Sequence, residues 1–416
     1  LVLSEWICDW GEKIMSGLGL SFSMKVLLVN NFGFNVGFYM LLPYLARHMM
    51  GDLGFSAGFA GFVMGMRVFS QLGLYLVGGT LADRFNYQSV ILLGCSLRVV
   101  GFALFGFVSG QPGVACAAFL TGFAGALFSP ACQALMARLT EGHPHREKIY
   151  ALQNVSSQSG AFFGPLAGMA LLGRGFRFLS FTSAGIFFLL LLLQWRYLPD
   201  TKGKDHASRQ SFWMDWLSIL RQKDFVIFCF IMSAYYLMFN QIYILLPLSV
   251  PNNGTVAAIF TLTAVLGILL QLPINHIMTH FFPRSARLGL GMGLMALSFP
   301  FLSANFGVVG EIPVAPLVTA AVLSLGMLII FPTALSMVPE LGHEQHQGIC
   351  FGVFYFFAGM AGAWGGGAGA WFWEVSPILL LWGLTGTGTF FALLLWLHTK
   401  KMEREQTPHE AVSAGH

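Results

Sequence analysis

The sequence predicts an all-α polytopic membrane protein with twelve transmembrane helices in two six-helix halves. Three observations predict this class: the composition, the spacing of the apolar runs and the positions of Lys and Arg. Hydrophobic residues make up 56% of the 416 residues and charged residues only 10%, and the mean hydropathy is +0.70. Soluble domains carry about 25% charged residues. A chain this apolar lacks the polar groups that would cover its surface in water.

Apolar runs of about 20 residues, the length that crosses the hydrocarbon core as a helix, follow one another along the chain. Short polar breaks separate these runs. We expect spans near residues 24–46, 55–81, 88–109, 112–137, 150–172, 178–197, 225–248, 255–279, 287–304, 313–338, 347–372 and 377–397.

The longest polar segment follows the sixth run and divides the chain. Its Trp213, Trp216, Leu217 and Leu220 predict a short amphipathic helix at the membrane interface. Residues 1–20 lack the continuous apolar core of a signal peptide. The expected organisation is a cytoplasmic or interfacial leader at 1–23, a six-helix half at 24–198, a linker at 199–224, a second half at 225–398 and a cytoplasmic tail at 399–416.

Lys and Arg predict the orientation, because cytoplasmic loops of membrane proteins are enriched in them. With twelve spans and a cytoplasmic N-terminus, 17 of the 22 basic residues fall on the cytoplasmic side and 3 on the outer side. The other two, Arg67 and Arg98, lie inside spans. We therefore expect a multi-pass membrane protein with both termini in the cytoplasm.

Several other classes are excluded. The six cysteines form no CxxC pair, and no metal-ligand spacing, catalytic triad or phosphate-binding loop is present at membrane depth. The net charge of +4 does not predict a nucleic-acid partner. We expect a monomer that is not an enzyme and holds no metal or cofactor, with the bilayer and a small-molecule substrate as partners.

The segment after the second span reads Gly78-Gly79-Thr80-Leu81-Ala82-Asp83-Arg84. Gly79 is expected to allow close approach of a neighbouring helix. Asp83, followed by Arg84, is expected to pair with a helix N-terminus or an arginine and so lock one conformation. An ordinary cytoplasmic turn is the alternative.

The fifth span carries Gly160, Gly164, Pro165 and Gly168. Small residues at a spacing of four favour a close contact between helices, and the proline bends the helix. A generic packing face is the alternative to a role in conformational coupling.

Both segments resemble signatures of the major facilitator superfamily, the first its loop motif and the second the antiporter motif of its drug exporters. The chain is similar over nearly its whole length to drug:proton antiporters of this superfamily. The resemblance implies the major facilitator fold, multidrug efflux and a proton as coupling ion. Two intramembrane acids of the similar antiporters are matched by Asn30 and by a position near Phe331.

The interior of the predicted bundle contains positive charge and no acid. All 18 acidic residues fall in loops, at span ends or in tails. Arg67 and Arg98 lie near the bilayer middle, where a charged side chain normally faces a cavity or a partner. Either the arginines donate to backbone carbonyls between helices, or they form a cationic cavity that binds an anionic substrate.

The polar residues expected at this cavity come from several spans. Besides the two arginines, the candidates are Asn30, Gln71, Tyr236, Asn240 and Gln241. Hydrogen bonding between helices is the alternative for the asparagines.

The sequence thus predicts a secondary-active exporter of a small organic molecule that works by alternating access. An anionic or zwitterionic metabolite such as a siderophore would suit the positive interior. An uncoupled or importing facilitator remains open because the titrating acid is missing, as does a non-transporting sensor.

Overall fold

The computed structural model describes residues 20–140, 143, 146–199, 219–250, 252–304, 306–309, 312–342 and 347–413. The described residues are almost entirely helical. Eleven helical segments are long and apolar enough to cross a membrane. A further long helix, α7, packs against α2 and α12 within the same bundle. The predicted all-α polytopic architecture is therefore confirmed.

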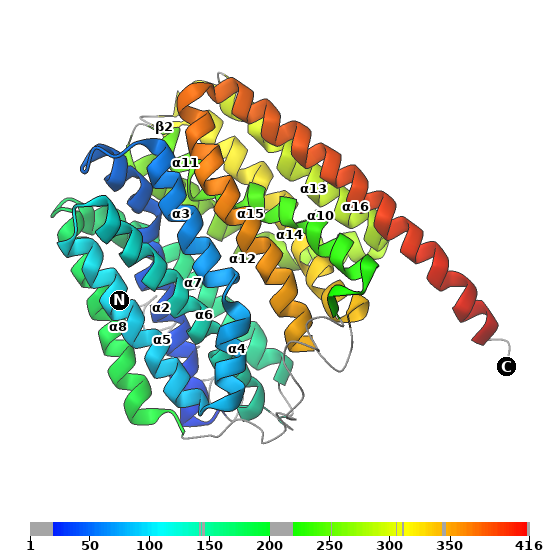
Figure 1. Ribbon diagram of the computed structural model, residues 1–416, viewed down its shortest axis with the longest axis horizontal. Helices are drawn as coiled ribbons and strands as arrows, with labels where there is room; N and C mark the ends of the chain where they lie inside the picture. Colours follow the sequence, from blue (N-terminus) through cyan, green and yellow to red (C-terminus); the bar gives the residue numbers. More distant parts are fainter. Residues whose placement is uncertain are drawn as a thin grey trace, which may run out of the picture.

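The N-terminal half, coloured blue to green in Figure 1, is a bundle of antiparallel helices. Its elements are α2 (Phe22–Gly51), α3 (Ala57–Leu72), α4 (Tyr75–Arg84), α5 (Tyr87–Phe107), α6 (Gln111–Leu139), α7 (Arg146–Leu172) and α8 (Phe176–Tyr197). Side chains of the residues before the helices fix several starts. Ser56 Oγ, for example, accepts the Phe59 N–H at 3.1 Å at the start of α3.

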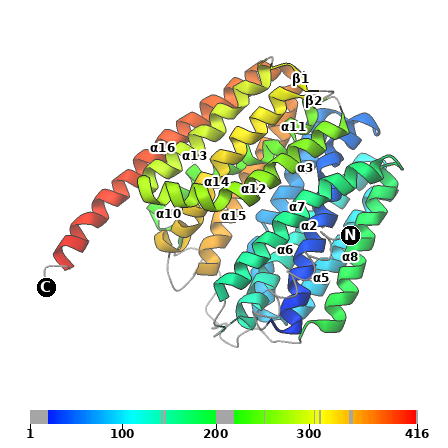
Figure 2. The ribbon, with the colours of Figure 1, turned by 180° about the vertical axis from the view of Figure 1, so that it is seen from behind.

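The C-terminal half, green to red, lies beside the first half in both Figure 1 and Figure 2. Its elements are α10 (Lys223–Phe239), η1 (Asn240–Ile242), α11 (Leu245–Leu248), α12 (Asn253–Phe281), α13 (Arg284–Ser298), η2 (Phe299–Ser303), β1 (Val308–Val309), β2 (Ile312–Pro313), α14 (Val314–Leu341), α15 (Gln347–Val375) and α16 (Pro377–Ser413). The antiparallel pair β1–β2 was not expected from the sequence. Across the two halves α15 packs on α3 and α12 packs on α7.

Two predicted spans are interrupted. The second ends one helix at Leu72 and resumes at Tyr75, because α15 approaches the chain closely at this point. A Cβ added to Gly359 of α15 would lie 2.6 Å from the Gly73 nitrogen. The seventh span breaks after Phe239, where η1 follows, and resumes as the short α11, which contains Pro247.

The final helix is longer than the predicted span 377–397, since α16 continues to Ser413 through most of the expected tail. The expected amphipathic helix lies almost wholly outside the described residues, which resume at Ile219.

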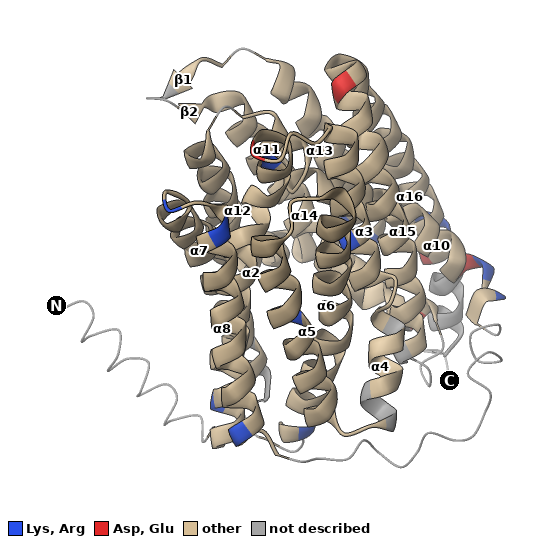
Figure 3. Ribbon diagram, turned by 60° about the vertical axis from the view of Figure 1, so that its left-hand side comes forward, with Lys and Arg blue, Asp and Glu red and all other residues tan. Residues whose placement is uncertain are grey.

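The outer surface of the bundle is apolar. In Figure 3 most ribbon positions coloured as Lys, Arg, Asp or Glu lie toward helix ends, and the flanks of the helices are largely tan. Large apolar side chains are exposed there, including Leu189 on α8, Leu272 on α12 and Trp364 on α15. Exposed apolar side chains of this size and number match a surface covered by lipid.

Candidate functional site

A cavity of about 570 Å³ lies between the two halves. The N-terminal half contributes residues of α2, α3 and α7 to its wall, and the C-terminal half contributes residues of α10, η1, α12, α14 and α15. Its polar lining comprises Arg67, Gln71, Asn154, Gln158, Asn240, Thr263, Gln271 and Ser324, together with the hydroxyls of Tyr39, Tyr235, Tyr236, Tyr243 and Tyr355. The volume and the mixed lining suit a small organic molecule.

Aromatic rings form much of the wall. Tyr235 stacks on Phe331 with ring centroids 6.0 Å apart, and Tyr236 meets Tyr355 edge to face at 6.4 Å. Such rings offer flat apolar surface with a polar tip, which fits aromatic or partly apolar ligands.

Arg67 is the cationic group in this wall. Its side chain is 5% exposed, and its Nη1 donates to Gln71 Oε1 at 3.0 Å. Its Cζ lies 5.2 Å from the centre of the Phe38 ring. Its Nε has no hydrogen-bond partner among the described residues. Arg67 therefore places a positive charge at the edge of the cavity, and its buried Nε keeps a donor without a partner among the described residues.

Arg98 lies deeper, outside the cavity lining, and its side chain is fully buried. Its Cζ stands 3.7 Å from the centre of the Phe34 ring and 5.3 Å from that of Phe38. Its Nε and Nη1 have no hydrogen-bond partner among the described residues. Arg67 and Arg98 thus share one aromatic ring, so both charges act on the same side of the cavity.

The other predicted cavity residues divide into two groups. Gln71, Tyr236 and Asn240 line the cavity. Asn30 and Gln241, expected there as well, lie outside its lining because each is used in packing. Asn30 Oδ1 accepts from Gln194 of α8 at 2.6 Å. Gln241 Nε2 donates to Leu237 O at 3.0 Å and to Gly365 O at 3.3 Å.

The sequence reasoning missed much of the aromatic wall and the hydroxyl pair that joins the halves. Tyr39 Oη and Tyr243 Oη lie 3.3 Å apart across the cavity.

The glycines of α7 lie against α2, as their spacing predicts. A Cβ on Gly160 would lie 2.6 Å from Phe32 O, and one on Gly164 would lie 2.7 Å from the Tyr39 Cβ. Gly168 faces Met40 O in the same way. These small residues let the two backbones touch.

Pro165 of α7 lies at this interface and lacks the backbone N–H that would make the next hydrogen bond of the helix. Its own carbonyl accepts the Tyr44 hydroxyl at 2.6 Å, which ties the helix to α2. The antiporter-like segment is therefore one face of a tight helix pair that adjoins the cavity wall.

The loop segment behaves differently from the expectation for its second glycine. Gly78, not Gly79, makes the close approach: a Cβ there would overlap Ala126 O of α6, whereas one on Gly79 would meet nothing within 4 Å. The two glycines are one residue apart on α4, so only one of them faces α6. The side chains of Asp83 and Arg84 lie outside the described set.

One end of the cavity is closed by contacts between the halves. Arg47 Nη1 of α2 donates to Val250 O at 3.0 Å, and the Ala57 N–H at the start of α3 donates to the Glu374 carboxylate at the end of α15. Below them α3 and α15 pack glycine on glycine. A Cβ on Gly366 would lie 2.6 Å from Gly61 O.

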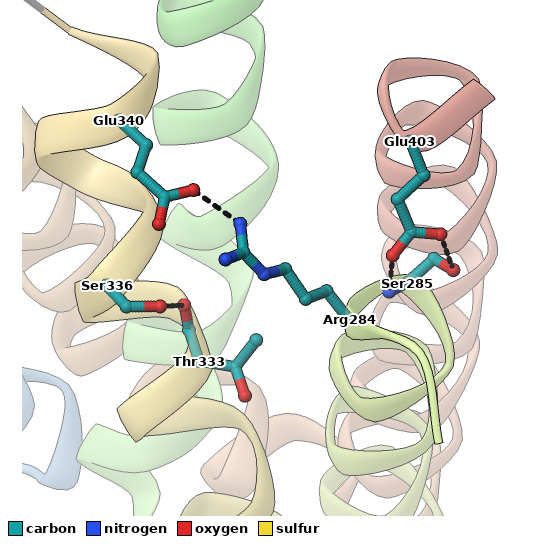
Figure 4. Close-up of polar contacts among 6 residues, drawn as sticks. All are labelled: Arg284, Ser285, Thr333, Ser336, Glu340 and Glu403. Atoms are coloured by element: carbon teal, nitrogen blue, oxygen red, sulfur yellow. Dashed lines mark hydrogen bonds and ion pairs between the residues drawn. The ribbon is translucent and has the colours of Figure 1, made fainter. Parts of the chain in front are cut away.

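The opposite end of the C-terminal half is held by polar contacts among α13, α14 and α16 (Figure 4). Arg284 forms an ion pair with Glu340. The Ser285 N–H and hydroxyl both donate to the Glu403 carboxylate, at 2.9 and 2.6 Å. Glu340 lies at the end of α14 and Glu403 in the last third of α16, and no described carboxylate lines the cavity.

The chain has relatives along most of its length. A family profile described as Major Facilitator Superfamily matches residues 27–366. An uncharacterised transporter of that type from Mycobacterium tuberculosis is 35% identical over 353 residues, 82% of this chain and 84% of the relative. The multidrug resistance protein MdtH of Photorhabdus laumondii is 28% identical over 389 residues, 91% and 95% of the two chains. A solved peptide transporter of the POT family, in complex with sulfate, has a TM-score of 0.81 at 14% identity and covers 92% of this chain and 96% of its own.

Proposed function

Because this chain belongs to the Major Facilitator Superfamily, we propose that it is a secondary-active transporter that moves a small organic molecule through the cavity at Arg67. It is a multi-pass membrane protein and not an enzyme. Transport proceeds by alternating access, with the two halves rocking about the site between them. The observation that carries the proposal is the cavity itself, which is walled by both halves and closed at one end.

Export is the direction we propose, and the similarity to multidrug resistance proteins supports it. The distribution of Lys and Arg supports a protein with both termini in the cytoplasm, and the similarity to bacterial multidrug resistance proteins supports the inner membrane as its location; we propose that it is a monomer. In that orientation the end of the cavity with the Arg47–Val250 and Ala57–Glu374 contacts faces outward.

Residues away from the lining support this cycle. The halves at 24–198 and 225–398 are the rocking bodies. The glycine face of α7 and the segment from Gly79 to Arg84 are the places where we propose that conformational change is transmitted.

Two substrate classes compete for the site. The similarity to drug:proton antiporters favours a drug-like molecule exchanged against protons. Arg67 and the absence of a described carboxylate in the lining favour an anionic or zwitterionic metabolite, such as a carboxylate-bearing siderophore. Because no described carboxylate lines the cavity, an uncoupled facilitator is also compatible with the site. A sensor with this fold would bind the molecule without transporting it.

Flux into proteoliposomes with and without an imposed pH gradient separates these functions. Flux that requires the gradient supports proton antiport, and equilibration without it supports a facilitator. A panel of anionic and cationic dyes assigns the charge preference. Binding of several dyes without flux of any of them would contradict the transporter assignment and leave a sensor.

A further inference from the structure

We infer that this protein is an anion exchanger, which binds an organic anion at Arg67 and changes its access only when an anion occupies the site. The inference rests on the proposed transport function and names its substrate class and its coupling. It starts from a charge imbalance in the N-terminal half.

The imbalance consists of two buried guanidinium groups without an acid. Arg67 and Arg98 are 5% and 0% exposed. None of the 18 acidic residues of the sequence lies in the middle of a membrane span, and the described residues that line the cavity include no carboxylate. Gln71 accepts one hydrogen bond from Arg67, but an amide supplies no negative charge.

Aromatic rings make the two charges tolerable without cancelling them. Phe34 lies under Arg98, and Phe38 lies within 5.3 Å of both guanidinium carbons. The negative faces of these rings attract the cations. Three N–H donors still lack partners among the described residues, namely Arg67 Nε, Arg98 Nε and Arg98 Nη1. An anion placed in the cavity beside Arg67 would neutralise part of this charge.

During alternating access, this excess of positive charge should couple movement of the carrier to the presence of a bound anion. Between the inward and outward states the site passes through an occluded state without bulk water. An uncompensated charge is least stable in such a place, whereas a pair of opposite charges is tolerated. The loaded carrier therefore reorients faster than the empty one, and each anion carried out is balanced by an anion carried back.

The described lining residues include no group that could neutralise the charge of Arg67 in place of a bound anion. Proton antiport needs a group that titrates in the cavity as access alternates. The described lining contains no Asp, Glu or His; apart from Arg67 its polar groups are amides and hydroxyls. The counter-substrate is therefore a second anion, which binds at Arg67 from the opposite side of the membrane.

Counterflow in proteoliposomes tests the inference. The full-length protein is reconstituted, and uptake of labelled naphthalene sulfonate, benzoate or phenyl phosphate is measured into vesicles that contain either the same unlabelled anion or sucrose. We expect at least one anion to enter about 100-fold faster when the anion is inside. A factor of 100 corresponds to about 2.7 kcal/mol of extra barrier for the empty carrier.

Arg67→Gln provides the second readout. Without this charge the empty carrier reorients more easily, so the ratio of exchange to net uptake should fall at least tenfold, and Arg67→Lys should retain most of the ratio. Arg196→Gln, at an exposed arginine on the end of α8, is the matched control and should leave the ratio unchanged. Retention volume and thermal midpoint establish that each variant is folded.

Results that contradict anion exchange can be told apart from results that contradict the proposed transport function. Equal uptake into anion-loaded and sucrose-loaded vesicles, or uptake driven by a pH gradient into sucrose-loaded vesicles, overturns exchange while transport stands. Transport of a cationic rhodamine dye with no flux of the three anions overturns the substrate class. No flux of any of these solutes counts against this inference and against the proposed function together.

Discussion

Gly366→Ala should push the closed end of the cavity open. Gly366 of α15 lies against Gly61 and Gly65 of α3, and an added Cβ would stand 2.6 Å from the Gly61 oxygen and 2.8 Å from the Gly65 Cα. Both neighbours are backbone atoms, which cannot rotate away as a side chain can. The methyl group fits only if the two helices separate at this end.

The size of the effect follows from the cost of overpacking. Forcing extra carbon into a packed contact costs about 1–3 kcal/mol. This cost applies only to the conformation in which α3 and α15 touch. At about 1.4 kcal/mol per tenfold change in an equilibrium constant, the balance should move about 5- to 150-fold toward the state open at this end.

Electron paramagnetic resonance between two spin labels measures that balance. Labels at Gly51→Cys and Val375→Cys sit on opposite halves at the closed end, in a background that lacks the six native cysteines. Gly366→Ala should enlarge the population with the longer distance.

Gly367→Ala is the control, since its Cβ would lie 3.9 Å from the Phe62 Cα, an ordinary contact. A distance distribution that Gly366→Ala leaves unchanged, in a folded protein, would refute the reasoning that this contact closes the cavity.

Three further predictions concern stability, measured as the thermal midpoint in detergent. Arg98→Met should hold or raise the midpoint, because it removes a buried charge without an acid partner, and a fall as large as that of Arg98→Ala would contradict this. Gln194→Leu should destabilise by about 1–3 kcal/mol, because the buried Asn30 loses its partner; adding Asn30→Leu should restore part of the loss, and a purely additive double variant would argue against that pairing. Arg284→Gln should change stability by less than about 1 kcal/mol, because its ion pair with Glu340 is half exposed, and a larger loss would show that the pair is not a screened surface contact.

The helical architecture could be predicted because hydrocarbon imposes a simple rule on the sequence. A span needs about 20 apolar residues, and every one of the twelve predicted runs corresponds to between one and three described helices. The interruptions could not be predicted in the same way. The break at Gly73 depends on the approach of Gly359 from a helix almost three hundred residues later.

The candidate site was predictable where polarity alone decides. A charged residue in a span must face a cavity or a partner, and this principle identified Arg67. The same principle grouped Asn30 with it, although Asn30 bonds to Gln194. Polarity does not distinguish a residue that faces a cavity from one that bonds between helices, because both satisfy the same requirement.

Aromatic residues pose the opposite problem. The chain contains 41 phenylalanines and 10 tyrosines, and many of them pack in the core or are exposed on the outer surface. Only the three-dimensional arrangement distinguishes Tyr39, Tyr243 and Tyr355 as lining residues. The loop segment shows the same limit: Gly78, which contacts α6, and Gly79, which does not, are adjacent in the sequence.

The central claim is that the cavity beside Arg67 holds the transported molecule. A structure of the protein with a transported anion bound, determined by electron cryomicroscopy, tests it most directly. The account predicts density for the anionic group within hydrogen-bonding distance of the Arg67 guanidinium, with the body of the molecule among the rings of Tyr236, Tyr243 and Tyr355. An empty cavity, with the anion bound elsewhere on the protein, would contradict it.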